Sequence, residues 1–177
     1  MKKITEPNHL EYAMYYENYI KKVDKTVSVL DQLKLNAKST VELIKSLNET
    51  QLTYSYAEGK WSIKDIIQHL IDCERVFIYR AMRFARNDKS PLPFFDEDAF
   101  AKEANADKLT TSKLLKEFTT TRNATIAFFN NQSASVMKRI GIASNYNMSV
   151  RACAWIICGH EIHHMGVIKE RYLLNKI

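Results

Sequence analysis

Three of the five histidines in this 177-residue sequence lie within five consecutive residues near its C-terminal end. They belong to the segment His160-Glu161-Ile162-His163-His164, which matches the H-E-x-x-H pattern of zinc peptidases. Histidines at i and i+4 of a helix lie one turn apart and can bind the same transition-metal ion. Three interpretations are open: a peptidase helix, another kind of metal site, or a histidine-rich patch without chemistry.

The peptidase interpretation fails on the residues around the motif. A zinc peptidase needs a third ligand downstream or on a nearby element, and Glu170 is the only acidic residue after His164. The longer H-E-x-x-H-x-x-G-x-x-H form would require glycine and histidine where this chain has Val167 and Glu170. The predicted chain also has no strand to hold an extended peptide. We interpret the match as a coincidence of the double histidine.

The predicted C-terminal helix presents His160 and His164 on its apolar face. At 100° per residue, His164 lies about 40° from His160, whereas His163 lies about 60° away and Glu161 about 100° away. Buried imidazoles without partners cost on the order of a few kcal/mol each, and a metal ion would be a partner for both. A hydrogen-bonded pair of core or surface histidines is the alternative that spacing alone leaves open.

A third metal ligand must come from another element. His69 is the only histidine of the predicted second helix, and His9 near the N-terminus is the remaining candidate. Three neutral imidazoles with an open fourth position suit Zn²⁺, Ni²⁺ or Fe²⁺ and are typical of catalytic sites. Cys73 and Cys153 lie near the same faces and could act as soft ligands, although a small buried residue is the simpler role.

Long helices must position these residues, because the sequence has only 4 Gly and 3 Pro and its apolar residues recur every three or four positions. Helices are predicted at about Thr26–Asn48, from Lys60-Trp61-Ser62 to about Arg86, and at about Ser112–Asn130 and Met148–Leu174. A long connection covers Asn87–Leu109, and a loop covers Gly141–Asn147. Ser62 and Asp65 form a capping box, and Trp61 is expected to pack at the helix start. The pattern predicts an all-α fold, a four-helix bundle with one long crossover connection.

We expect a single domain over residues 1–177, in which an aromatic N-terminal extension, residues 1–25, packs on the bundle. In the long connection, Phe94 and Phe95 precede three acidic residues, Asp96-Glu97-Asp98. This stretch could form a lid over the metal site or attach the connection to the bundle.

Two positions of the second helix have alternative roles. Glu74 lies near the centre of the apolar stripe and could act beside a metal, but pairing with an arginine such as Arg122 or Arg171 is favoured, since buried carboxylates need a partner. Tyr79 and Arg80 could line a pocket, although an exposed helix face is the simpler expectation.

The composition of the chain argues against nucleic-acid-binding, membrane and disulfide-rich proteins. The net charge is +6, from 26 Lys+Arg against 20 Asp+Glu, but the basic residues are scattered in pairs, which is typical of solvated surface and does not support a nucleic-acid partner. No apolar run reaches membrane-spanning length, and Met1–Leu10 has no signal-peptide core, so we expect a cytoplasmic protein without a membrane partner. Three cysteines without a C-x-x-C pair argue against a disulfide framework.

The predicted C-terminal helix has a second apolar strip, which bears on whether the protein forms a dimer. It lies between about 120° and 220° on the wheel and comprises Ala154, Trp155, Cys158, Ile162, Met165 and Leu173. A bundle helix normally keeps this side polar, so either the N-terminal extension or a second subunit must cover the strip. Two-fold dimers are the commonest soluble oligomers, and we expect a homodimer.

Three segments resemble the DinB-like superfamily: GKWSIKDIIQHLIDCERVFIYRAMRFARND (Gly59–Asp88), PLPFFDEDAF (Pro91–Phe100) and ICGHEIHHMGVIKERYL (Ile157–Leu173). The resemblance extends from about Tyr54 to Leu174, with the sub-branch often called a second DinB family. It implies a four-helix bundle that holds a divalent metal through one histidine of the second helix and an H-x-x-x-H pair on the fourth. Carried over position by position, these ligands are His69, His160 and His164.

The resemblance also implies an activity. Some relatives are S-transferases that use bacillithiol or mycothiol, and others are described only as candidate metal-dependent hydrolases. A metal with an open position can hold a thiol or a water as its anion near neutral pH. The leading hypothesis is therefore an S-transferase-like enzyme that acts on a small-molecule substrate with a low-molecular-weight thiol as co-substrate. Hydrolysis is the first alternative, and a non-catalytic metal-binding or dimeric interaction module is the second.

Overall fold

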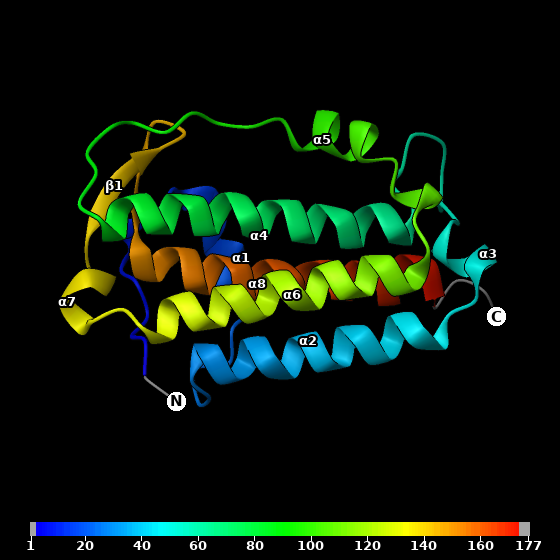
Figure 1. The fold of residues 1–177 in the computed structure, drawn as a ribbon, viewed down its shortest axis with the longest axis horizontal. Coiled ribbons are helices and arrows are strands. Elements are labelled where there is room, and N and C mark those ends of the chain that lie inside the picture. Colours follow the sequence, from blue (N-terminus) through cyan, green and yellow to red (C-terminus); the bar gives the residue numbers. More distant parts are fainter. Residues whose placement is uncertain (1–2, 174–177) are drawn as a thin grey trace.

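A computed structural model describes residues 3–173 of the chain. Four long helices lie side by side in it (Figure 1): α2 Val29–Ser46, α4 Ile63–Ala85, α6 Thr111–Asn130 and α8 Val150–Val167. α4 packs against α6 and α8, and α2 packs against the same two helices. The predicted four-helix bundle is therefore confirmed, and its two layers of paired helices leave α4 and α8 in direct contact along the core.

Side-chain caps determine where the long helices begin. In the predicted capping box of α4, Ser62 Oγ accepts a hydrogen bond from the Asp65 N–H at 3.1 Å, and Asp65 Oδ2 accepts one from the Ser62 N–H at 3.0 Å. Ser28, Thr110 and Ser149 cap α2, α6 and α8 through their side-chain oxygens. Because each cap satisfies a backbone N–H that the helix leaves unpaired, these starts fall within three residues of the predicted ones.

The predicted long connection contains more structure than its sequence indicated. Asp96 caps a short helix, α5 Glu97–Ala104, and a 3-10 turn, η3 Ala106–Lys108, follows. Figure 1 shows this connection running along the outer side of α4. The crossover therefore lies over the helix that carries His69.

The predicted loop before α8 is a β-hairpin, so the expectation of a chain without strands is wrong. β1 Ile140–Ala143 pairs antiparallel with β2 Tyr146–Ser149. Its turn residues, Ser144 and Asn145, have positive φ angles of 51° and 68°. Two-residue hairpins favour such angles but usually supply them with glycine, and the sequence lacks that signal here.

Shorter elements complete the described chain: η1 His9–Glu11, η2 Met14–Tyr16, α1 Glu17–Ile20, α3 Glu49–Leu52, α7 Ala134–Met137 and η4 Ile168–Leu173. The last of these is a π-helical continuation of α8. The predicted fourth helix therefore extends in the structure to Leu173, and Leu174 lies outside the described residues.

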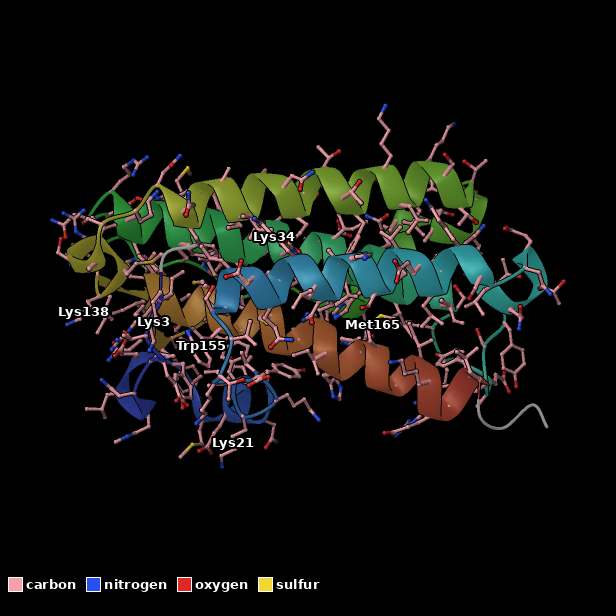
Figure 2. The ribbon with its side chains drawn as sticks, turned by 90° about the horizontal axis from the view of Figure 1, so that it is seen from below. Lys3, Lys21, Lys34, Lys138, Trp155 and Met165 are labelled. Carbon is pink, nitrogen blue, oxygen red and sulfur yellow. The ribbon has the colours of Figure 1, made fainter. Side chains whose placement is uncertain are left out.

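The N-terminal segment packs directly on α8. Its helix α1 contacts α8, and the approach is closest at Gly159, where an added Cβ would lie 2.0 Å from the carbonyl oxygen of Tyr19. An ion pair between Glu11 and Arg151 attaches η1 to the start of α8. Figure 2 shows the segment that carries Lys21 beside α8 near Trp155. Only glycine permits this contact between backbones.

The second apolar strip of α8 is covered by the chain itself. Ala154, Trp155 and Cys158 are buried and belong to the same core cluster as Ile20 of α1 and Leu33 of α2. Ile162, Met165 and Leu173, the other residues of the strip, are half-buried against the core. The chain itself therefore packs against the strip, and the homodimer stays a prediction. No helix within residues 3–173 has both the length and the apolarity to cross a membrane.

Candidate metal centre

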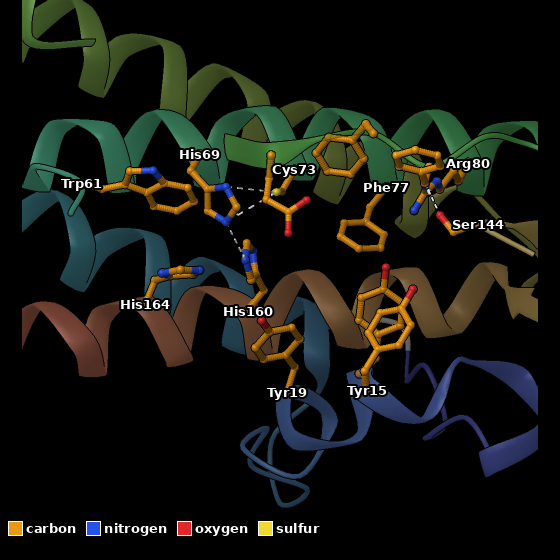
Figure 3. Close-up of a pocket in the computed structure, with 14 residues that line it drawn as sticks. Tyr15, Tyr19, Trp61, His69, Cys73, Phe77, Arg80, Ser144, His160 and His164 are labelled. Carbon is orange, nitrogen blue, oxygen red and sulfur yellow. Dashed lines mark hydrogen bonds between the residues drawn. The ribbon is translucent and has the colours of Figure 1, made fainter. Parts of the chain in front are cut away.

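α4 and α8 bring the three predicted histidines together. His69 comes from α4 and His160 and His164 from α8, and one ring nitrogen of each lies within 4.8 Å of the other two. The three rings converge between the two helices in Figure 3, with centroids 4.5, 4.8 and 4.9 Å apart. Among the described residues, no other histidine, cysteine or carboxylate joins this group, and His9 lies exposed in η1.

Burial keeps these imidazoles neutral. His69 and His160 are each 7% exposed, and their Nε2 atoms lie 3.0 Å apart. Desolvation lowers the pKa of His69 to about 4 and, together with the neighbouring imidazoles, that of His164 to about 3. The same causes place the pKa of His160 well below its ordinary value. Neutral imidazole is the form that binds metal ions, so the site is ready for one at pH 7.

Aromatic rings support the imidazoles. Trp61 lies 4.5 Å from the ring of His69 and 6.4 Å from that of His164, while Tyr19 lies 5.2 Å from His160 and 5.3 Å from His163. Trp61 therefore does more than pack at the start of α4. His163 is half-buried against Tyr19 and lies outside the three-ring group, on the flank where the helical wheel placed it.

The histidines open into a cavity of about 530 Å³. Its walls are mostly aromatic and include Tyr15, Tyr16, Tyr19, Trp61, Phe77 and Phe95. Phe94 also borders it and is 76% exposed, which places this ring at the mouth. The aromatic-acidic stretch of the crossover thus lies over the site, as the lid interpretation requires.

A thiol, Cys73, lies beside His69, and a carboxylate, Glu97, lies on the same cavity. Sγ of Cys73 is 3.6 Å from the ring nitrogens of His69, and burial followed by the charge of Glu97 raises the pKa of this thiol. Glu97 borders the same cavity. Cys153 is fully buried, and desolvation raises its pKa to about 12. Neither cysteine belongs to the ligand group, and both are protonated thiols at neutral pH.

The predicted pairing of Glu74 with Arg122 is confirmed, and the structure adds Glu161 to it. Arg122 donates from Nη2 to Glu74 Oε2 at 2.8 Å and from Nη1 to Glu161 Oε2 at 2.6 Å. Thr40 Oγ1 donates to Glu161 Oε1 at 2.7 Å. Each long helix contributes one member, so this buried network joins the whole bundle. Glu161, the glutamate of the apparent peptidase motif, therefore serves the core and does not reach the metal face.

The expectation of an exposed face at Tyr79 and Arg80 is half wrong. Tyr79 is 46% exposed, but Arg80 is 2% exposed and borders the cavity. Its position follows a signal that the sequence does carry: His69, Cys73, Phe77 and Arg80 are spaced by four, four and three residues and share one face of α4. The other predicted partner of Glu74, Arg171, instead donates to the hydroxyl of Tyr56 at 2.9 Å.

Comparison with known proteins places these features in context. A family model described as the DinB superfamily matches residues 32–168. A candidate metal-dependent hydrolase of Oceanobacillus iheyensis is 26% identical over 145 residues, which cover 79% of this chain and 81% of the relative. YfiT from Bacillus subtilis, described as a probable metal-dependent hydrolase with an unusual four-helix bundle topology, superposes with a TM-score of 0.66 at 18% identity, over 94% of this chain and 90% of that one. A mycothiol-dependent maleylpyruvate isomerase superposes with a TM-score of 0.64 at 12% identity, over 77% of this chain and 57% of that one. The two solved structures show the shared fold.

Proposed function

Because the chain belongs to the DinB superfamily, we propose that it is a metal-dependent hydrolase that binds one divalent transition-metal ion through His69, His160 and His164. The observation that carries this proposal is the convergence of three neutral imidazoles, two buried and one half-buried, on one aromatic cavity with a carboxylate at its border. The descriptions of the Oceanobacillus relative and of YfiT support the same class of reaction.

The donor set fits such an ion. Imidazole nitrogens suit Zn²⁺, Ni²⁺ and Fe²⁺, and three protein ligands leave one position open, as catalytic sites require. When bound, the ion supplies Lewis-acid chemistry that lowers the pKa of a water or thiol at that position. The ring contacts from Trp61 and Tyr19 restrict the imidazole orientations, so the three donors stay directed at one point.

Glu97 is the side chain that can take up the proton released by a water nucleophile. Its carboxylate borders the cavity and lies close enough to Cys73, the neighbour of His69, to raise the pKa of that thiol. A base within reach of the nucleophile is what hydrolysis requires. The aromatic walls bind the apolar part of a substrate and exclude bulk water.

Transfer to a low-molecular-weight thiol is the second candidate. It uses the same ligands and the same cavity and differs only in the nucleophile. Burial raises the pKa of Cys73, Cys153 and Cys158, so a reactive thiol would have to come from a second small molecule. The structural likeness to a mycothiol-dependent isomerase is the reason to test transfer to a thiol beside hydrolysis.

Metal analysis tests the ligand set. After loading with Zn²⁺, Ni²⁺ or Fe²⁺, the wild-type protein and His163→Ala should retain about one ion per chain, and His160→Ala and His164→Ala should retain none. His163 is a matched control because its ring centroid lies 5.0 Å from that of His164 but outside the ligand group. Metal retained by His160→Ala, or lost from His163→Ala, would contradict the proposed site.

Turnover assays separate the nucleophiles. The metal-loaded protein is incubated with esters and amides that carry apolar or aromatic groups, with and without an added thiol. Product formed without thiol, lost in His160→Ala and kept in His163→Ala, supports hydrolysis, and Glu97→Gln should then lower kcat by roughly 10²- to 10⁴-fold. Product formed only with thiol would replace hydrolysis by S-transfer. An absence of turnover in every combination would contradict both and favour a binding module.

A further inference from the structure

Arg80 lies at the end of the cavity opposite the three histidines. It lies eleven positions after His69 on the same face of α4, which at a rise of 1.5 Å per residue is about 16 Å along the helix axis. Figure 3 shows Arg80 and Ser144 at one end, the histidines at the other and Phe77 between them. The cavity therefore has two polar ends joined by an aromatic section.

The guanidinium of Arg80 is held on one edge and unpaired on the other. Its Nη2 donates to the carbonyl oxygen of Pro93 and to Ser144 Oγ, each at 3.0 Å. The rings of Phe77 and Phe95 each lie 5.7 Å from its Cζ. Its Nη1 is buried and makes no hydrogen bond with any atom of residues 3–173. These contacts fix the guanidinium while leaving one donor group free.

Arg80 differs from the other buried cations of the described chain. Arg122 lies between two buried glutamates, and Lys64 pairs with Glu49. Arg80 is 2% exposed and forms no ion pair with a carboxylate of residues 3–173; Glu97, the carboxylate on the same cavity, lies beyond ion-pair distance. A buried cation without a counter-charge is costly, so this end of the cavity favours an anion that the chain itself does not provide.

Two hydroxyl groups complete this end of the cavity. Ser144 Oγ accepts its hydrogen bond from Arg80, so its own proton is available for another acceptor. The backbone N–H of Ser144 donates to the carbonyl oxygen of Leu92 at 3.0 Å, which fixes the hairpin turn against the crossover. Tyr16 borders the same cavity. Burial, followed by the neighbouring Tyr15, raises the pKa of its phenol, and the charge of Arg80 opposes that rise.

We propose that the Arg80 end binds the carboxylate of an elongated organic acid whose scissile bond lies at the histidines. The unpaired Nη1 of Arg80 and the hydroxyl proton of Ser144 match the single charge and two oxygens of a carboxylate, whereas a doubly charged phosphate calls for more donors. The aromatic walls between the ends suit an apolar or aromatic middle section. This inference rests on the proposed function for the position of the reacting bond, but the anion site needs neither metal nor turnover.

Isothermal titration calorimetry on the metal-free protein tests the anion site. The probes are 4-phenylbutyrate and its neutral counterpart, 4-phenylbutanamide. The wild-type protein should bind the acid at least tenfold more tightly than the amide, and Arg80→Met should abolish this preference while leaving the affinity for the amide unchanged. Arg83→Met is the matched control, because Arg83 pairs with Asp88 outside the cavity, and it should keep the preference. Equal affinities in the wild type, or a preference that survives in Arg80→Met, overturn the proposal.

Further variants separate this inference from the proposed function. Metal-free His160→Ala should keep the preference for the acid over the amide. If His160→Ala loses this preference and Arg80→Met keeps it, the anion binds at the histidines and the proposal for Arg80 is overturned. Phenyl phosphate bound more tightly than the acid would overturn the choice of carboxylate. If circular dichroism shows that Arg80→Met does not fold, Arg80→Lys, which keeps the charge but loses the planar fork, should weaken the preference. If the wild-type protein prefers the acid but shows no hydrolysis, the proposed function is contradicted and the anion site is not.

Discussion

Replacing Arg122 by methionine tests how the four helices are held together. The substitution keeps a long apolar side chain but removes the cation that pairs with Glu74 and Glu161, which are 3% and 1% exposed. It also removes the donor to the carbonyl oxygen of Leu33, at 2.9 Å. Breaking a buried ion pair from one side costs about 3–5 kcal/mol. Because two carboxylates lose their partner here, we expect a loss near the upper end, about 4–5 kcal/mol of unfolding free energy.

Urea denaturation followed by far-UV circular dichroism measures this loss. The matched control is Arg75→Met, because Arg75 is 52% exposed, pairs with Glu117 at the surface and should contribute less than about 1 kcal/mol. Adding Glu74→Gln to Arg122→Met removes one of the two stranded charges and should recover part of the stability. An Arg122→Met protein as stable as Arg75→Met would refute the view that this network holds the core.

Three further predictions concern pH, backbone contact and assembly. The metal-free protein should lose stability as pH falls from about 6.5 towards 4, because His69 takes up a proton in the unfolded chain but stays neutral in the folded one. The difference between its folded pKa of about 4 and the ordinary value corresponds to about 3 kcal/mol of unfolding free energy. Urea denaturation at several pH values checks this, and a stability that does not change with pH would contradict it. Gly159→Ala should lower the unfolding free energy by about 1–3 kcal/mol in thermal unfolding, because its Cβ would clash with the backbone of Tyr19. Gly166→Ala is the control: there is open space around Gly166, so the substitution should be neutral or stabilising. The proposed homodimer should sediment at twice the chain mass of 20.6 kDa, and a species of 20.6 kDa would remove it.

Local patterns in the sequence were sufficient to predict the four long helices and two of the three candidate metal ligands. The long helices follow from apolar residues at three- and four-residue spacing and from capping residues such as Ser62. The same periodicity put His160 and His164 on one face of α8 and His163 on the flank, because helical geometry alone relates positions one turn apart. His69 and His9 were the candidates for the third ligand, and the resemblance to the DinB-like superfamily selected His69, because spacing within one helix does not relate residues of different elements.

Tertiary structure alone decided what covers each helical face. Arg80 was expected on an exposed face, but the hairpin and the crossover bury it at the cavity end, and the residues that do so lie far away in the sequence. The second strip of α8 suggested a partner subunit, whereas Ile20 of α1 and Leu33 of α2 belong to the core cluster that buries Ala154, Trp155 and Cys158. Helical periodicity states which residues share a face, but burial and charge pairing depend on the segments that fold against that face, so only the packed chain determines them.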